Sequence, residues 1–232
     1  MKERIYSHAS IAVVFSKQSG EFLFDQYTDT YTIVNWRGRI NLIGGNQSPE
    51  DYSPRGIWER EILEEFCFPE FSEAVDIPEA PFNERALIAK TLIANATPYK
   101  DFLVKIPEVM EFRNNKLQKR GPIVKINTVY ETYLDEDIFE CVRRNLKEGR
   151  RLRSEGGSVL KHIDELTTGR IPPASATGII MKDYLNLRHL NMPNPEKISA
   201  LPIGSPRETL NDYLSDFEYE KPFSFQRLAS QP

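Results

Sequence analysis

The residues of this chain that most clearly suggest chemistry are three glutamates, Glu61, Glu64 and Glu65, which follow Arg60. At about 100° per residue, a helix through this stretch would place the three carboxylates within roughly 100° of arc. Carboxylates gathered on one face raise one another's pKa, so a cation is expected beside them. Arg60 can neutralise Glu64, four residues on, and a divalent cation such as Mg²⁺ would supply further charge. The stretch is therefore a candidate metal site.

The segments around these glutamates distinguish such a site from the ordinary alternative, a solvated acidic helix face. Residues 53–66 are predicted to form the helix, because Ser53 can cap it and Pro54 suits its first turn. A paired glycine, Gly44-Gly45, ends the preceding predicted strand and can bring backbone groups close to the same place. Strand, glycine turn, acidic loop and helix together favour the metal site over the solvated face.

Hydrophobic patterning predicts the remaining elements. We expect strands over residues 10–15, 21–27, 30–34, 39–43, 86–96, 101–106 and 123–134, helices over 137–148, 159–166, 176–190 and 208–217, and a loop over 112–120. The six prolines and isolated aromatic residues of 193–232 indicate a C-terminal extension that wraps the domain or a partner. The expected organisation is one domain over 1–192 followed by this Pro-rich extension.

Composition excludes several classes of protein. The 232 residues are 40% hydrophobic and 28% charged, as in an ordinary globular domain, and the net charge of −4 gives no bulk attraction to nucleic acid or anionic membrane. Two cysteines are too few for a disulfide framework and suggest a reducing compartment, so we expect a cytoplasmic protein. The apolar run at 11–15 is too short for a signal or a membrane span.

The stretch from Gly44 to Phe68 resembles the signature of the Nudix hydrolase superfamily. That signature is a glycine, five residues, Glu, seven residues, Arg-Glu, an aliphatic residue, any residue, Glu-Glu, any residue and a glycine. Residues 60–65 (REILEE) match its second half residue for residue. Cys67 stands at the place of the final glycine, and one or two extra residues precede Arg60. The order of predicted elements follows the family's pattern over residues 5–190.

The resemblance implies an α/β fold, a Nudix-like α/β/α sandwich with a mixed β-sheet, and Mg²⁺-dependent cleavage of the pyrophosphate linkage in a nucleoside diphosphate derivative. Mn²⁺ is the expected substitute metal. By carry-over, Glu61, Glu64, Glu65 and the backbone of Gly45 bind the metal. Glu61 and Glu64 also serve catalysis, with Arg60 orienting a carboxylate. The resemblance leaves a homodimer open.

Residues outside the motif are candidates for contact with a nucleotide-derived substrate. Trp36 and Arg37 lie in a predicted turn, where they would stack on or pair with a nucleotide or else be simply exposed, and Arg39 follows them. Glu148 is a candidate for substrate contact or, like Glu155, for the general base. Each of these two acids is otherwise an ordinary solvated side chain.

Two other functions compete with the hydrolase. The first is a Nudix-like domain that binds a nucleotide or sugar-nucleotide without cleaving it, as the altered motif would allow. The second is a nucleic-acid-binding protein that uses the basic stretches 112–120 and 142–153, which the negative net charge disfavours. The sequence leaves the identity of the nucleotide derivative open.

Overall fold

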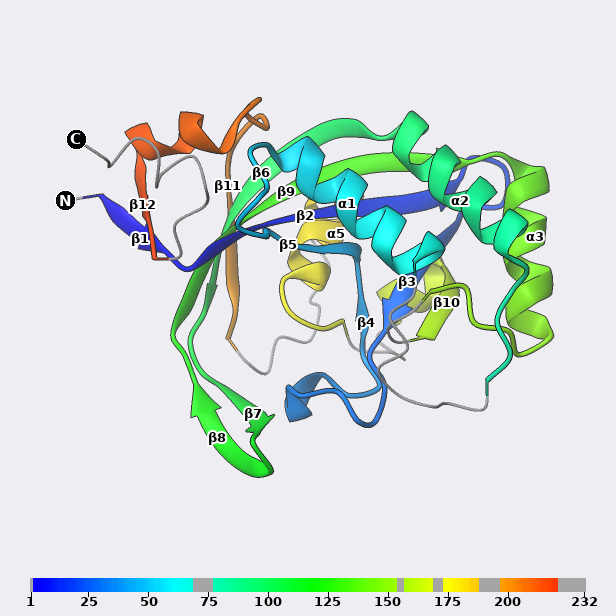
Figure 1. Ribbon diagram of the computed structural model, residues 1–232, viewed down its shortest axis with the longest axis horizontal. Coiled ribbons are helices and arrows are strands. Elements are labelled where there is room, and N and C mark those ends of the chain that lie inside the picture. The colour runs from blue at the N-terminus through cyan, green and yellow to red at the C-terminus, as the bar shows by residue number, and fades with distance from the viewer. Residues whose placement is uncertain (1, 69–76, 154–156, 169–172, 188–196, 221–232) are drawn as a thin grey trace.

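A mixed β-sheet forms the centre of the computed structural model (Figure 1). The structure describes residues 2–68, 77–153, 157–168, 173–187 and 197–220. The strands of the sheet are β2 (Ser7–Ser16), β3 (Glu21–Gln26), β4 (Ile40–Asn41), β5 (Ile43–Asn46), β6 (Thr97–Ile106), β9 (Ile123–Leu134), β10 (Gly157–His162) and β11 (Ser199–Gly204).

The order of these strands is β10-β3-β2-β9-β6-β11, with β4 paired to β3 and β5 paired to β2. The two central strands β2 and β9 are parallel and pair from Ser7 opposite Lys125 to Ser16 opposite Leu134. The other strand pairs described in this sheet are antiparallel. The predicted mixed sheet is therefore confirmed.

Helices pack on both faces of the sheet (Figure 1). The helices on one face are α1 (Pro54–Cys67), α2 (Phe82–Asn95) and α3 (Glu136–Lys147), and the helix on the other is α5 (Thr177–Tyr184). On the first face, Trp58 and Phe66 of α1 pack with Leu92 of α2 against Val14 of β2. All four side chains are almost fully buried, so this contact fixes α1 over the sheet.

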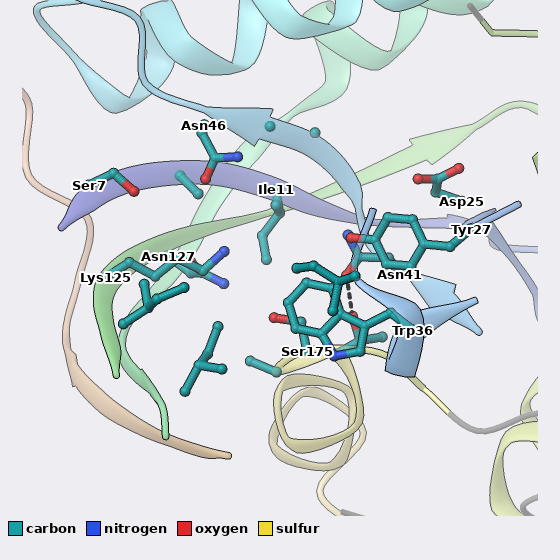
Figure 2. Close-up of a pocket in the computed structure, with 18 of the residues that line it drawn as sticks. Ser7, Ile11, Asp25, Tyr27, Trp36, Asn41, Asn46, Lys125, Asn127 and Ser175 are labelled. Atoms are coloured by element: carbon teal, nitrogen blue, oxygen red, sulfur yellow. Dashed lines mark hydrogen bonds between the residues drawn. The ribbon is translucent and has the colours of Figure 1, made fainter. Parts of the chain in front are cut away.

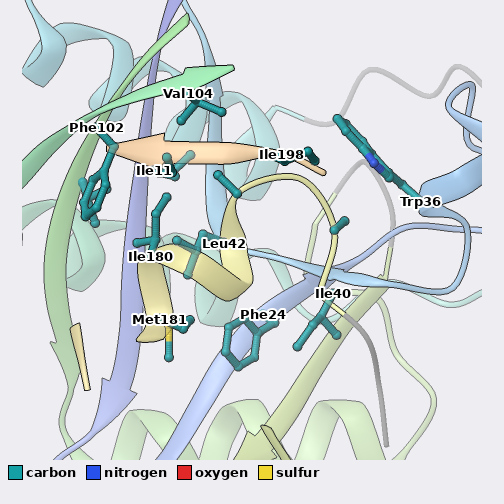
Figure 3. Close-up of a cluster of buried hydrophobic side chains, with 14 of the residues drawn as sticks. Ile11, Phe24, Trp36, Ile40, Leu42, Phe102, Val104, Ile180, Met181 and Ile198 are labelled. Carbon is teal, nitrogen blue, oxygen red and sulfur yellow. The ribbon is translucent and has the colours of Figure 1, made fainter. Parts of the chain in front are cut away.

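A second hydrophobic cluster holds α5 against the opposite face (Figure 3). Ile180 and Met181 of α5 pack there with Ile11, Phe24 and Val104 from three strands. The sheet thus lies between two layers of helices, as the predicted α/β/α sandwich requires. In the part of the chain that the structure describes, no helix is long and apolar enough to span a bilayer.

Helix α1 begins and ends as local sequence signals dictate. The Ser53 hydroxyl oxygen accepts a hydrogen bond from the Gly56 amide at 2.9 Å, and Pro54 opens the first turn. At the other end the Phe68 amide donates to the carbonyls of Leu63 and Glu64, with Phe68 at φ −126°. The helix therefore ends without a left-handed glycine, which accommodates Cys67, and the prediction of a helix over 53–66 is confirmed.

Two predicted strands are wrong. Residues 86–96 lie in helix α2, because the buried residues Ile88, Ala89 and Leu92 have the spacing of one helix face rather than of a strand. Residues 30–34 make a single bridge, Ile33 to Glu111, and then enter the 3₁₀ turn η1 (Val34–Trp36). The predicted strand over 39–43 is divided into β4 and β5.

The predicted loop over 112–120 is instead a hairpin of β7 (Val109–Arg113) and β8 (Lys116–Arg120). Most of its side chains are exposed, so apolar alternation is missing from its sequence. Its turn residues Asn114 and Asn115 have φ of 51° and 58°, the left-handed conformation of a tight hairpin turn. The hairpin extends away from the sheet (Figure 1).

Three other predicted helices differ in extent. Of the predicted helix 159–166, the first four residues belong to strand β10, which pairs with β3 over residues 157–162. The short helix α4 (Ile163–Thr167) follows this strand. Helix α5 ends at Tyr184, short of the predicted 176–190, of which 188–190 lie outside the described residues. The helix predicted over 208–217 is the 3₁₀ segment η2 (Leu210–Ser215).

The described part of the predicted C-terminal extension packs on the sheet. Strand β11 pairs with β6 at the sheet edge, and β12 (Phe217–Tyr219) pairs in parallel with β1 (Glu3–Ile5). Beneath them a buried network joins His8 to Thr128 at 2.7 Å, Thr128 to Asp101 at 2.6 Å and Tyr213 to Asp101 at 2.6 Å. A domain boundary at 193 stays a prediction, since 193–196 and 221–232 lie outside the described residues.

Candidate functional site

A cavity of about 290 Å³ lies between the sheet, the start of α5 and the carboxylates of α1 (Figure 2). Ser7, Ala9 and Ile11 of β2 form its floor together with Lys125 and Asn127 of β9. These residues share one face because side chains alternate along a strand and Ser7 and Ala9 stand opposite Lys125 and Asn127. The volume is near the lower limit for ligand pockets, which run from roughly 300 to 1,000 Å³.

Gly45 allows the Glu61 carboxylate to lie directly against strand β5 at the cavity wall. A methyl group at Gly45 would stand 2.0 Å from Glu61 Oε2, so only glycine leaves room for the carboxylate. Burial raises the pKa of Glu61, and the nearby Arg60 guanidinium opposes that rise. The prediction that the paired glycine and the helix carboxylates meet is confirmed for this pair.

Glu65 lies one helical turn after Glu61 and lines the same cavity. It is 8% exposed, and one of its oxygens pairs with Arg153, which also pairs with Asp25 at 3.3 Å. Burial raises the pKa of Glu65 to about 8; Arg153 opposes the rise, and the charges of Asp25 and Glu61 add to it. A cation bound beside Glu65 would favour its ionised form and so oppose this rise in pKa.

Arg60 binds the acidic loop to the face of α1. Its guanidinium donates to the Asn46 carbonyl at 2.7 Å and pairs with Asp51 at 2.9 Å, Glu61 at 2.9 Å and Glu64 at 2.8 Å. Arg60 thus pairs with Glu61, and the orienting role that the family resemblance implies for it stays a prediction. Glu64 points out of the cavity lining, with 55% of its side chain exposed.

The residues present fit a divalent cation that is shared with a ligand. Mg²⁺ in proteins is typically held by one or two carboxylates together with substrate phosphates. Glu61 and Glu65 supply two carboxylates, and Glu65 Oε2 is buried with no hydrogen-bond partner among the residues described. No group of three His, Cys, Asp or Glu side chains in the described ranges is arranged to hold a metal by itself.

Three aromatic rings line the cavity next to Asp25, on the side away from Lys125 and Asn127 (Figure 2). Tyr27 stacks on Tyr31 with centroids 3.9 Å apart, and both stack with Trp36. All three line the cavity, and Trp36 Nε1 is a buried donor without a hydrogen-bond partner in the described structure. Flat rings with an unused donor suit a planar, hydrogen-bonding ligand group such as a nucleobase.

The other predicted contact residues lie away from this cavity. Arg37 donates from Nε to the Tyr31 carbonyl at 2.9 Å, so it supports the aromatic cluster from behind, and Arg39 also lies outside the lining. Glu148 is exposed and pairs with Arg150 at 3.0 Å. Glu155 lies outside the described residues.

The basic stretch 142–153 is divided among separate ion pairs. Arg143, Arg144, Arg150, Arg151 and Arg153 each pair with an acidic side chain. Their partners lie on different elements, so the stretch forms no single cationic surface. This disposition disfavours nucleic-acid binding through these arginines.

Sequence reasoning missed most of the cavity residues, and four of them show why. Asp25 and Arg153 come from distant segments, and nothing local to either one marks their contact with Glu65. Lys125 and Asn127 did leave a signal, because they occupy alternate positions of β9 beside buried apolar residues. Polar side chains on the inward face of a central strand are a reason to expect a ligand site.

Comparison with known proteins adds a similarity of fold. No family model matches the chain, and no curated protein is significantly similar to it in sequence. Among solved structures, the chain is similar to the crystal structure of the MutT protein from Methanosarcina mazei Go1, with a TM-score of 0.43 and 14% identity, over 81% of this chain and 99% of that one. A likeness of this degree carries no argument about activity, so the function rests on the site itself.

Proposed function

We propose that the protein is a divalent-cation-dependent hydrolase of the Nudix type, which cleaves the pyrophosphate linkage of a nucleoside diphosphate derivative. The observation that carries this proposal is the cavity that Glu61 and Glu65 share with Gly45 and with a stacked aromatic cluster. The motif REILEE at residues 60–65 supports the same assignment.

In this proposal the base binds at Tyr27 and Trp36 (Figure 2), and the pyrophosphate binds at Glu61 and Glu65, which line the same cavity. Glu61 and Glu65 would hold the cation, which supplies charge neutralisation at the phosphates and a more acidic water. The water gives up a proton to solvent as its oxygen bonds to one phosphorus, the bridging P–O bond breaks, and its electron pair stays on the departing phosphate. Arg60 keeps Glu61 in place throughout.

Turnover of a panel of nucleoside diphosphate derivatives with Mg²⁺ or Mn²⁺ tests the proposal. We expect Glu61→Gln and Glu65→Gln each to lower turnover by at least a hundredfold while the chain remains folded. Glu59→Gln is the matched control, because Glu59 is on the same helix and pairs with Arg55 outside the cavity. Wild-type turnover in both cavity variants would reject the site.

Glu64→Gln tests the remaining predicted ligand. Because Glu64 faces Arg60 and solvent, we expect a smaller loss of turnover than for Glu61→Gln or Glu65→Gln. A loss as large as theirs would place Glu64 on the cation during the reaction.

One observation favours the alternative, a domain that binds a nucleotide without cleaving it. Arg153 already pairs with Glu65 and Asp25, and a permanent guanidinium can replace the charge of a cation. Tight binding of nucleotide derivatives without turnover, unaffected by EDTA, would support this alternative. Cation-dependent turnover would reject it.

Two further parts of the proposal concern setting and assembly. A cytoplasmic location is supported by Cys67 and Cys141, which are both free thiols. A homodimer is a prediction that sedimentation equilibrium tests directly.

A further inference from the structure

We propose that the end of the cavity opposite the aromatic cluster binds an anionic group on the non-nucleotide part of the substrate. The substrate class would then be nucleoside diphosphates whose second substituent carries a phosphate or a carboxylate. This inference rests on the proposed function and extends it to the part of the ligand that the carboxylates and the aromatic rings do not reach.

The cationic end is formed by Lys125 and Arg120, which line the cavity beside Asn127. In the part of the chain that the structure describes, no acidic side chain pairs with Lys125, whereas Arg120 pairs with Glu111 at 3.1 Å. Burial, together with the charge of Arg120, lowers the pKa of Lys125 to about 8. An ammonium group held in a cavity beside a second cation is stabilised by an anion.

Asn127 gives an independent sign of a ligand at this end. Its side chain is almost fully buried at 2% exposed, and Oδ1 has no hydrogen-bond partner among the residues described. Buried polar atoms are nearly always hydrogen-bonded in folded proteins, so a ligand donor is expected here. A sugar hydroxyl of the ligand would donate a hydrogen bond to Asn127 Oδ1, and an anionic group next to that hydroxyl would contact Lys125.

The Lys125 end of the cavity lies apart from the aromatic cluster and from the Glu61 carboxylate. In Figure 2, Lys125 and Asn127 lie on one side of the cavity and Tyr27 and Trp36 on the other. Gly45, against which the Glu61 carboxylate lies, stands opposite Ser10 on β2, whereas Lys125 stands opposite Ser7.

Three residues along β2 and two strand spacings therefore separate Gly45 from Lys125, roughly 14 Å between Cα atoms. The Lys125 side chain, which reaches into the cavity, shortens this span. The remaining distance suits a sugar-sized group that lies between a pyrophosphate at Glu61 and an anionic group at Lys125.

Matched ligand pairs that differ only in the anionic group test the inference. UDP-glucose and UDP-glucuronate differ by one carboxylate, and ADP-ribose and ADP-ribose 1″-phosphate differ by one phosphate. Dissociation constants would be measured by calorimetry at pH 7 without a divalent cation, so that the compounds are not cleaved during the titration. We expect the wild-type chain to bind the anionic member of at least one pair about tenfold more tightly, and the two pairs distinguish carboxylate from phosphate.

Lys125→Gln should remove this preference while changing the affinity for the neutral member less than twofold. Lys125→Arg, which keeps the positive charge, should retain it. Lys119→Gln is the matched control, since Lys119 is exposed on the nearby hairpin and pairs with Glu108. Equal weakening of both members in Lys125→Gln would overturn the inference, because Lys125 would then contact the shared pyrophosphate.

These dissociation constants, together with turnover in Mg²⁺, separate this inference from the proposed function. Neutral compounds that bind and are cleaved, with no preference for their anionic partners, would overturn the inference and leave the hydrolase standing. Preferential binding of the anionic compounds without turnover would support the inference and reject the hydrolase. Absence of both binding and turnover for all four compounds would overturn both.

Discussion

Replacement of Gly45 by alanine is expected to lower activity about a hundredfold while leaving the fold intact. The added methyl would lie 2.0 Å from Glu61 Oε2, whereas ordinary contacts begin near 3.4 Å, so the carboxylate must move by about 1.4 Å. The obstructing atoms are the far end of a side chain, which can rotate away without moving the backbone. A displacement of about 1 Å in a catalytic group can lower a rate by roughly a hundredfold.

The neighbouring glycine provides the contrast. Gly44 has a φ of +123°, and a methyl there would lie 2.2 Å from the Ser10 carbonyl oxygen of the adjacent strand. Because neither backbone can give way, Gly44→Ala should destabilise the fold by more than the roughly 1–3 kcal/mol of backbone strain alone. Gly157→Ala, whose methyl would meet nothing closer than 3.8 Å, is the control for the substitution itself.

Three measurements on these variants test whether activity depends on the space that Gly45 leaves for the Glu61 carboxylate. Turnover reports the catalytic effect, Mn²⁺ binding followed by electron paramagnetic resonance reports the cation site, and urea denaturation reports stability. For Gly45→Ala we expect about a hundredfold lower turnover, weaker Mn²⁺ binding, and an unfolding free energy within about 1 kcal/mol of wild type. Unchanged turnover and Mn²⁺ affinity in a folded Gly45→Ala chain would refute the role given to Glu61.

Further predictions concern stability and thiol chemistry. Burial lowers the pKa of His8 to about 3, so between pH 6.5 and pH 5 only the unfolded chain takes up a proton at this residue. Lowering the pH from 7.5 to 5 should therefore reduce the unfolding free energy of the wild-type chain by about 2 kcal/mol more than that of His8→Gln, as measured by urea denaturation. An equal pH dependence in both chains, or a His8 imidazole that titrates near pH 6.5 by NMR, would contradict this. Trp58→Ala should lower the unfolding free energy by about 3–5 kcal/mol because Trp58 is fully buried, whereas Leu117→Ala on the exposed hairpin should change it by less than about 0.5 kcal/mol. Burial and the nearby Glu84 carboxylate raise the pKa of Cys141 to about 11, so in a Cys67→Ser chain the remaining thiol should react with DTNB at pH 8 about a hundredfold more slowly than free cysteine; a rate equal to that of free cysteine would show that the thiol is exposed.

The sequence predicted elements well where local signals agree with tertiary packing. Helix α1 has a capping serine, a proline in its first turn and apolar residues at helical spacing, and all three signals point to the same structure. Strand β9 is a central strand whose apolar and polar residues alternate between the two faces of the sheet, and its predicted bounds, 123–134, are the observed ones. In these elements short-range pattern and long-range packing give the same answer.

The failures have equally local causes. The apolar segment 86–96 has β-branched residues but buries only the stripe containing Ile88 and Leu92, so its spacing is a better guide than its composition. The outer part of the hairpin, residues 112–119, is exposed, so hydrophobic pattern carries no information there. Its Asn114-Asn115 turn was the available signal.

The candidate site divides in the same way. Glu61, Glu65 and Gly45 are close in sequence or linked by a known motif, and the sequence indicated that they meet. The contact of Glu65 with Asp25 and Arg153 joins three distant segments through side chains whose types are common on any surface. No local pattern in a single sequence predicts such a contact, because only the folded sheet brings the three residues together.

The pairing of β1 with β12 has a consequence for how the chain is made in the cell. Residues 3–5 leave the ribosome long before their partners at 217–219, because more than 200 residues separate the two strands along the chain. Until then Ile5 and its neighbours Leu103 and Ile126 lack the cover of Tyr213 and Phe217. The nascent chain therefore carries an uncovered apolar edge until residues 210–219 have been made, which makes this edge a natural binding site for a chaperone.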